Sequence, residues 1–173
     1  MVKVLSFNYI FKYSFDLVTQ VYFKKYTSGY DKNVEEVWVV EENKDIEHNV
    51  DYIKRKGKCA NIIPWSLQMF FCEPAIYFEE EIWFNRNEKK MTMYTRNVSF
   101  TELATLEERS VYKVSDEDDR WTTFEQEGTI TVNGIGWFNS FAEKCAATVF
   151  SYGANKGFGI MEELLKKLEN EES

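Results

Sequence analysis

Two lysines lie inside apolar patterns of helical spacing, and they are the residues of this sequence best suited to bind an anion. Lys156 stands four residues after Tyr152 and four before Ile160, within an apolar pattern that repeats every three or four residues over 137–170. An ammonium group among such side chains must reach water or meet an anion, because an unpaired buried charge is costly. A lysine that merely extends past a core helix to solvent is the simpler explanation.

Three glycines, Gly153, Gly157 and Gly159, surround Lys156. A glycine in a helix interior costs about 0.5–1 kcal/mol relative to alanine, so the group predicts that something approaches this backbone closely, or that the helix kinks here. Lys25 continues the apolar side of a shorter helical pattern in the same way. Its simpler explanation is a helix-end lysine that opposes the helix dipole.

Two charged runs stand out from the rest of the sequence. The run 54–58, Lys-Arg-Lys-Gly-Lys, is predicted to lie at the end of a strand, where it either guards the mouth of a pocket or is simply solvated. The run 79–81 consists of three glutamates. On a strand Glu79 and Glu81 point away from Phe78 and Ile82, so we expect them on an exposed edge.

Residues for catalysis or metal binding are scarce. His48 is the one histidine, and it is far in sequence from any cysteine. Cys59, Cys72 and Cys145 show no C-x-x-C spacing, so neither a zinc site nor a disulfide framework is indicated. We therefore expect no catalytic residues, no metal and no cofactor.

The composition indicates one domain over residues 1–173 with a large apolar interior. Fourteen Phe, ten Tyr and five Trp supply aromatic side chains that line cavities as often as they fill cores. The net charge of −8 argues against general affinity for nucleic acid or for strongly anionic membranes. The sequence shows no apolar run of membrane-spanning length and no signal or transit peptide, so we expect a soluble protein.

The order of predicted elements indicates an α+β fold. Alternating or β-rich segments predict seven strands, at 2–11, 34–42, 48–56, 76–85, 89–98, 103–114 and 121–132, and periodic segments predict helices at 14–26 and 137–170. Short turns between consecutive strands favour an antiparallel meander. We expect a curved antiparallel sheet of about seven strands that, with the short N-terminal and long C-terminal helices, encloses an aromatic-lined tunnel.

The segment 61–76 is unusually apolar for a connection and carries both prolines, Pro64 and Pro74. Such a segment is either buried, as a loop or a short core helix, or a lid that contacts a lipid surface. The side chains of the predicted lid are Ile62, Ile63, Trp65, Leu67, Met69 and Phe70.

Several ordered motifs together resemble the PRELI-like family of mitochondrial phospholipid transfer proteins, and within it the slowmo type. The resemblance covers nearly the whole chain. The motifs are Asn-Tyr-Ile-Phe at 8–11, Leu-Val-Thr-Gln at 17–20, Lys-Lys-Tyr at 24–26, Tyr-Thr-Arg-Asn-Val-Ser-Phe at 94–100, Leu-Glu-Glu-Arg-Ser-Val-Tyr at 106–112, Thr-Ile-Thr-Val-Asn-Gly at 129–134 and Ala-Asn-Lys-Gly at 154–157.

This resemblance implies a seven-stranded sheet that encloses one phospholipid beneath a flexible lid. Members of the family carry phosphatidic acid or phosphatidylserine between the mitochondrial membranes, usually in complex with a small twin Cys-x9-Cys protein of the intermembrane space. It also implies a phospholipid as cargo rather than a cofactor, only transient contact with membranes and no nucleic acid. The resemblance therefore predicts an intermembrane-space carrier that is not an enzyme.

The resemblance assigns headgroup binding to Lys25, Lys58 and Lys156, and tunnel lining to Val149, Tyr152 and Gly153. In the branch that prefers phosphatidic acid, a second basic residue and an asparagine stand where this chain has valine and glycine at 149 and 153. This departure leaves phosphatidylserine as an open possibility. The family's Tyr-Pro-Asn-Pro after the first helix is here Tyr-Thr-Ser-Gly at 26–29, without the rigidity of proline.

Two other classes of function remain open. One is a small-ligand-binding protein or cyclase-like enzyme on a helix-grip sheet, with Tyr52 or Glu107 acting in the cavity. The other is a structural partner whose apolar loop 61–76 is an interface for another chain.

Overall fold

Seven antiparallel strands and two helices make up the part of the chain that the structure describes. The computed structural model describes residues 2–27, 29–61, 75–102, 104–133 and 139–171. The elements in chain order are β1 (Val2–Phe11), α1 (Phe15–Lys25), β2 (Val34–Asp45), β3 (Val50–Ala60), β4 (Ala75–Asn85), β5 (Lys90–Asn97), β6 (Ala104–Val114), β7 (Thr122–Val132) and α3 (Asn139–Glu171). The predicted α+β class, seven-stranded sheet and long C-terminal helix are confirmed.

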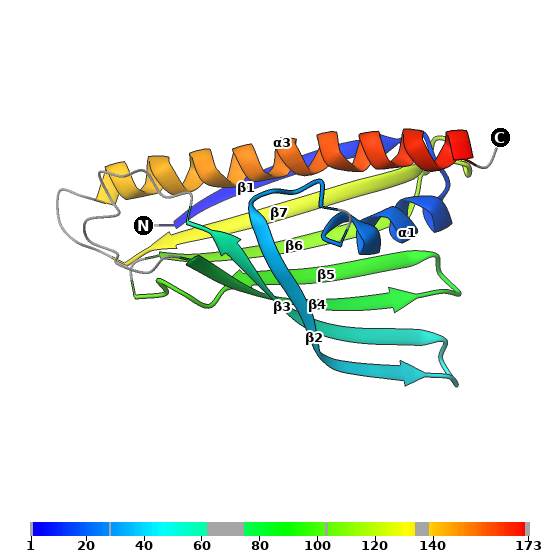
Figure 1. The fold of residues 1–173 in the computed structure, drawn as a ribbon, viewed down its shortest axis with the longest axis horizontal. Helices are drawn as coiled ribbons and strands as arrows, with labels where there is room; N and C mark the ends of the chain where they lie inside the picture. The colour runs from blue at the N-terminus through cyan, green and yellow to red at the C-terminus, as the bar shows by residue number, and fades with distance from the viewer. Residues whose placement is uncertain (1, 28, 62–74, 103, 134–138, 172–173) are drawn as a thin grey trace.

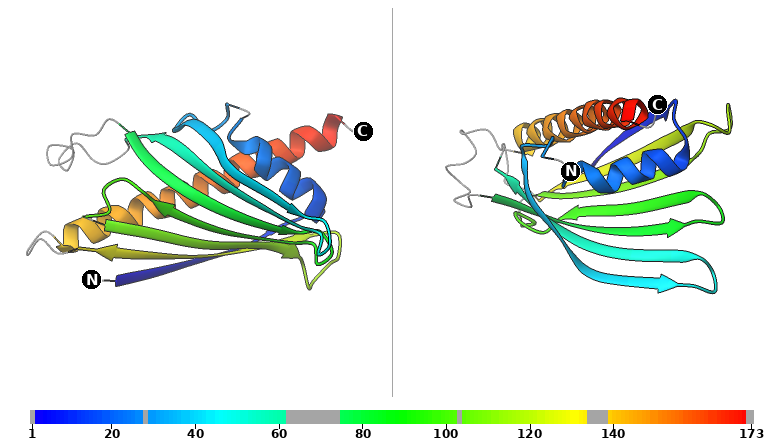
Figure 2. Two further views of the ribbon diagram at one scale, coloured as in Figure 1. Left: turned by 90° about the horizontal axis from the view of Figure 1, so that it is seen from below. Right: turned by 45° about the vertical axis from the view of Figure 1, so that its right-hand side comes forward.

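The strands form one open sheet in the order β1-β7-β6-β5-β4-β3-β2. Strands β2 to β7 form a meander, and β1 closes back on β7, so the first and last strands of the chain are neighbours. Both helices lie on the same concave side of this sheet, as the views in Figure 1 and Figure 2 agree. One face of the sheet is therefore covered by helices, and the other is the outer face.

Helix α1 begins and ends where its sequence predicts. The hydroxyl of Ser14 accepts a hydrogen bond from the backbone N–H of Leu17 at 3.4 Å, and Asp16 lies in the positive first turn. The side of the helix formed by Phe15, Val18 and Tyr22 is buried. Helix α1 contacts α3 and β6, so it fills the space between the long helix and the sheet.

Helix α3 buries a side that is rotated from the predicted stripe. Each step of four residues turns an α-helix by about 400°, so positions spaced by four drift about 40° per step around the axis. Ile160 and Leu164 of the predicted stripe are buried, whereas Tyr152, two steps before Ile160, is 56% exposed. The helix buries Phe150 and Met161 instead, so the prediction that Tyr152 faces the interior is wrong.

The core joins the helices to the sheet in two clusters. The larger cluster contains buried aromatic and aliphatic side chains of α1, α3 and five strands, among them Phe11, Tyr22, Ile82, Met91, Phe124 and Leu165. The smaller one joins Phe150 of α3 to Ile130 and Val132 of β7. A Cβ at Gly128 would overlap the ring of Phe150, so this glycine lets α3 lie close to the sheet. Each such side chain contributes roughly 1.5–3 kcal/mol when fully buried.

The predicted lid side chains from Ile62 to Phe70 lie outside the described residues, as do Pro64 and Pro74. The side chain of Val149 also lies outside the described part of α3. Neither described helix is long and apolar enough to cross a membrane.

Candidate functional site: a cavity between the sheet and the long helix

A cavity of about 290 Å³ lies between the concave face of the sheet and the two helices. This volume is near the lower end of the roughly 300–1,000 Å³ that is typical of pockets for small molecules. Most of its walls are apolar or aromatic, and they include Ile76, Phe78, Met93, Leu106, Phe124, Phe150, Phe158 and Met161. The polar part of the wall includes Lys25, Asp31, Glu80, Arg96, Glu108 and Gln126.

The structure places Lys25 of α1 against the backbone of α3, at the residue that follows Lys156. The Nζ atom of Lys25 lies 3.2 Å from the position that a Cβ on Gly157 would occupy, so this glycine gives Lys25 room beside the helix backbone. Lys156 is the next residue, and its Nζ atom contacts Oδ1 of Asp31 at 2.7 Å. Gly153 also lines the cavity. The close approach predicted from the glycines is therefore made by a lysine of α1.

Lys58, the third predicted headgroup lysine, lies on the other face of the sheet. Strand β3 continues to Ala60, so the basic run is inside the strand and its side chains alternate between the two faces. Cys59 lines the cavity, and Lys58 points outward, where its Nζ atom contacts Oε2 of Glu35 at 2.6 Å. The structure thus does not place Lys58 with Lys25 and Lys156.

A polar row crosses the apolar concave face. The strand registers place Arg55 of β3 opposite Glu80 of β4, Glu80 opposite Thr95 of β5, and Thr95 opposite Glu108 of β6. Neighbouring strands are about 4.8 Å apart, so the backbones of the two glutamates are roughly 10 Å apart. Two carboxylates and a guanidinium therefore lie in one line beneath α1.

Glu80 is held firmly in this row. Its carboxylate accepts hydrogen bonds from Arg55 Nε, from the Tyr22 hydroxyl and, at 3.5 Å, from the Thr95 hydroxyl. The side chain of Glu80 is 3% exposed, so its pairing with Arg55 is a buried ion pair. The Nη2 atom of Arg55 is the one buried side-chain nitrogen or oxygen without a hydrogen-bond partner in the described residues.

Glu108 has a different environment. Its Oε2 atom accepts a hydrogen bond of 3.0 Å from the side-chain amide of Gln126, which also donates to Ser110 at 3.1 Å. Burial raises the pKa of Glu108 to about 7; Lys25 partly offsets this rise, and Glu80 adds to it. The carboxyl lines the cavity, and its raised pKa lies near neutral pH.

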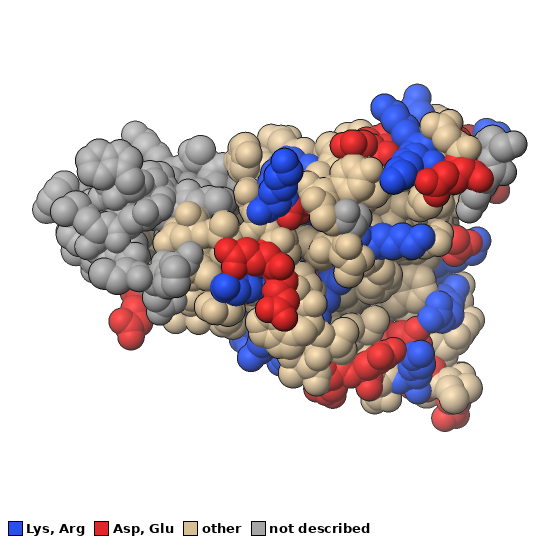
Figure 3. Space-filling view, in the orientation of Figure 1, with Lys and Arg blue, Asp and Glu red and all other residues tan. Residues whose placement is uncertain are grey.

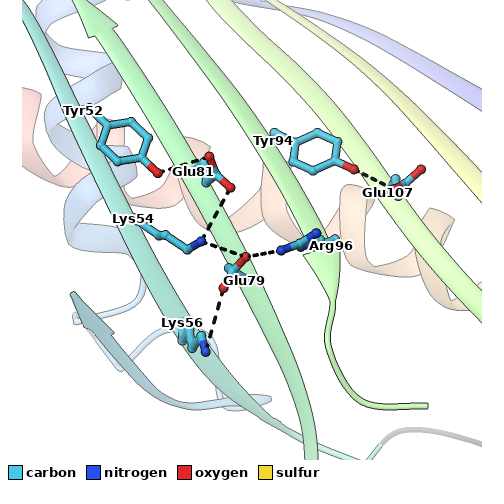
Figure 4. A network of polar contacts seen from close by, with 8 residues as sticks. All are labelled: Tyr52, Lys54, Lys56, Glu79, Glu81, Tyr94, Arg96 and Glu107. Atoms are coloured by element: carbon cyan, nitrogen blue, oxygen red, sulfur yellow. Dashed lines mark hydrogen bonds and ion pairs between the residues drawn. The ribbon is translucent and has the colours of Figure 1, made fainter. Parts of the chain in front are cut away.

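A second polar cluster covers the outer face (Figure 4). Glu79 lies at its centre, in contact with Lys54 at 3.2 Å, Lys56 at 3.8 Å and Arg96 at 2.6 Å. Glu79 is only 6% exposed because these three side chains cover it, so the prediction that it forms an exposed, solvating edge is wrong. Burial alone would raise the pKa of Glu79, but the hydrogen bonds and charges of Arg96 and Lys54 hold it below its usual value.

Tyr52 and Glu107, the residues that the enzyme alternative required in the cavity, are part of the same outer cluster. The Tyr52 hydroxyl donates to Glu81 at 3.1 Å, and the Tyr94 hydroxyl donates to Glu107 at 2.6 Å (Figure 4). Neither residue lines the cavity. Side chains alternate between the two faces of the sheet along β3 and β6, and Tyr52 and Glu107 occupy positions that point to the outer face.

The polar row was not predicted, although the sequence contains a signal for it. Along β4, Glu80 points to the same face of the sheet as the apolar Phe78 and Ile82, and along β6, Glu108 points to the same face as Leu106 and Tyr112. A charged side chain that points to the apolar face of a strand is comparable to a lysine within the apolar stripe of a helix. The same reasoning that selected Lys156 would have selected these two glutamates.

The surface charge is mixed. On the face drawn in Figure 3, lysine and arginine side chains are interspersed with acidic ones over the described residues and gather in no broad basic area. This distribution agrees with the net charge of −8.

Comparison with known proteins shows both a family and a fold. The model of the PRELI-like family matches residues 16–172. Among solved structures, Ara h 8.0201 is 9% identical, with a TM-score of 0.60 over 96% of this chain and 99% of that one. The Zhui aromatase/cyclase from Streptomyces sp. R1128 is 11% identical, with a TM-score of 0.58 over 94% of each chain. A START superfamily protein from Mycobacterium smegmatis is 10% identical, with a TM-score of 0.55 over 93% of this chain and 98% of that one.

Proposed function

We propose, from the premise that this chain belongs to the PRELI-like family, that it is a non-enzymatic carrier of one anionic glycerophospholipid. The family and the START-like, helix-grip fold are those of domains that bind lipids or other hydrophobic ligands. The specific cargo, phosphatidic acid or phosphatidylserine, and its transfer between mitochondrial membranes are the proposed part.

The observation that carries this proposal is the position of Lys25 in an apolar cavity, against the α3 backbone at Gly157, with Lys156 paired to Asp31 of the cavity wall. Acyl chains gain roughly 0.8 kcal/mol per buried CH₂ group against such walls. A phosphate gains charge-assisted hydrogen bonds from ammonium groups, and these offset its desolvation. One end of the cavity thus suits a phosphate and the rest suits hydrocarbon.

The outward positions of Tyr52 and Glu107 support a carrier over a cyclase-like enzyme. Both side chains are engaged in hydrogen bonds on the outer face, away from any ligand in the cavity. We further propose the mitochondrial intermembrane space as the location and a small twin Cys-x9-Cys protein as the partner. These two statements rest on the family.

Lipid transfer between vesicles tests the role of the lysines. Donor vesicles that contain fluorescent phosphatidic acid or phosphatidylserine are mixed with acceptor vesicles, and the wild type is compared with Lys25→Glu and Lys156→Glu. Each variant places a carboxylate where the phosphate would bind, so we expect transfer to fall at least about tenfold, which corresponds to about 1.4 kcal/mol. Lys166→Glu is the matched control, because Lys166 is an exposed lysine of the same helix.

The folded state of each variant is checked by circular dichroism before transfer is measured. Transfer that is unchanged in both Lys25→Glu and Lys156→Glu would show that these lysines do not meet the headgroup. A wild type that carries no lipid by native mass spectrometry and transfers neither phospholipid would refute the carrier function itself.

A further inference from the structure

Charged groups of both signs lie at the proposed headgroup site. Of the residues that line the cavity, Asp31 pairs with Lys156, Glu80 pairs with Arg55, and Arg96 pairs with Glu79 on the outer face. These ion pairs cancel one another's charge, and the two charged lining residues that remain are Lys25 and Glu108. The protein without cargo is therefore close to neutral at this site.

An anionic headgroup would upset that balance. A phosphate brought beside Lys25 adds negative charge to a site that already holds three carboxylates. An excess charge away from water is costly, and ionisable groups respond by changing protonation. One of the carboxylates should therefore become neutral when the cargo is anionic.

The hydrogen bonds distinguish among the three carboxylates. Asp31 accepts from Lys156 at 2.7 Å and from the backbone N–H of Asn33 at 3.1 Å. Glu80 accepts from Arg55 and Tyr22, so both of these carboxylates have strong donors that favour the charged form. Glu108 accepts its hydrogen bond from the neutral amide of Gln126.

The amide of Gln126 suits either protonation state of Glu108. Its NH₂ group donates to the carboxylate in the present structure, and its carbonyl oxygen can accept from a carboxylic acid after the amide rotates. Protonation therefore breaks no obligatory contact of Glu108. The other two carboxylates would each lose a charge-assisted partner.

We propose that Glu108 belongs to the headgroup site and takes up one proton from solvent when an anionic headgroup binds beside Lys25. This inference rests on the proposed function and deepens it, because it assigns a proton to the loading step. The carboxylate becomes a carboxylic acid, and the phosphate replaces it as the anion that faces Lys25. Cargo binding and proton uptake are then one coupled equilibrium.

The surroundings of Glu108 favour this exchange. The titratable or charged groups that line the cavity around it are Tyr22, Lys25 and Tyr26 of α1, Glu80 of β4, Arg96 of β5 and Tyr112 of β6, together with Asp31 and Cys59. Arg55 of β3 is paired with Glu80. Burial already raises the pKa of Glu108 to about 7. A phosphate near Lys25 would offset the positive charge that lowers this pKa and would repel the Glu108 carboxylate. The pKa of Glu108 should therefore rise further when the cargo binds.

Proton uptake during loading tests the inference. Short-chain phosphatidic acid is added to protein in weakly buffered solution at pH 8, where Glu108 without cargo is mostly ionised, with a pH indicator to count protons and native mass spectrometry to count bound lipid. Phosphatidic acid titrates near this pH itself, so the decisive quantity is the difference between wild type and Glu108→Gln. We expect the wild type to take up about one more proton per bound lipid.

Three controls make the result specific. Glutamine keeps the shape of Glu108 and removes a buried charge, so the variant should fold. Glu108→Asp keeps a titratable group and should retain proton uptake. Glu107→Gln alters the neighbouring carboxylate on the outer face and should behave as the wild type. Above neutral pH, the affinity of Glu108→Gln for the lipid should exceed that of the wild type by about tenfold per pH unit.

The possible results separate the inference from the carrier function. Equal proton uptake by wild type and Glu108→Gln, with lipid bound to both, would overturn the role of Glu108 and leave the carrier function intact. A wild type that binds no phosphatidic acid and no phosphatidylserine would overturn the carrier function first. A difference of about one proton, absent in Glu107→Gln, would establish the coupling.

Discussion

Replacement of Glu108 by glutamine should stabilise the protein without cargo at pH 8 and change its stability little near pH 4. The carboxyl of Glu108 has a pKa of about 7 in the folded protein, against an ordinary value of 4.5. At pH values between these two pKa values, the Glu108 carboxyl has released its proton in the unfolded chain but retains it in the folded protein. Rising pH therefore favours the unfolded state across this window, and the loss of stability is complete above pH 7.

The size of the effect follows from the same two values. Each pKa unit corresponds to about 1.36 kcal/mol, so the full difference amounts to about 3 kcal/mol at pH 8. Glu108 is only partly buried, so solvent screens its carboxylate, which makes this the upper end of the range. Glutamine has no charge to lose, so the variant should gain this amount relative to the wild type. For a chain of this length, the gain corresponds to roughly 6–12 °C in Tm.

Urea denaturation of wild type and Glu108→Gln at several pH values between 4 and 8 measures the effect. Glu107→Gln is the matched control, since the Glu107 carboxylate lies on the outer face and accepts from Tyr94 at 2.6 Å. The stability difference for Glu108→Gln should grow with pH, and that for Glu107→Gln should stay constant. A difference for Glu108→Gln that is constant with pH, or that shrinks as pH rises, would refute the reasoning.

Two further predictions concern the packing around the cavity. Arg55→Met leaves the carboxylate of Glu80 buried without its cation, so it should cost about 3–5 kcal/mol in urea denaturation, and adding Glu80→Gln should restore most of this; a double variant no more stable than the single one would contradict the ion pair. Gly128→Ala should cost about 1–3 kcal/mol because its Cβ would overlap the ring of Phe150, and Phe150→Leu in the same chain should reduce that cost; strictly additive costs would contradict the contact.

Local sequence patterns were sufficient to predict the elements. The alternation in 2–11 and the turns between later strands predicted a sheet, and Ser14 predicted the start of α1. Such signals lie within a few residues of one another, so they need no knowledge of the fold. The helical pattern also selected Lys25, which the structure places beside Gly157, and Lys156, which contacts Asp31 of the cavity wall.

Predictions that depended on neighbours in space were less successful. The outward position of Lys58 follows from the length of β3, which continues to Ala60 instead of ending within the basic run. The burial of Glu79 follows from cations on β3 and β5 that no local pattern connects to it. Tyr152 is exposed because steps of four residues drift around the helix, and contact with the sheet decides which side is buried.

The sequence by itself determined the kinds of elements, their order and two of the charged groups at the cavity. The tertiary structure alone decided that Glu80, Thr95 and Glu108 share one row, because only the register of three strands places them in line. It also decided that Lys25 and Gln126, about a hundred residues apart, both face that row. The charge of a carboxyl depends on all groups within a few ångströms, and those groups come from distant parts of the chain.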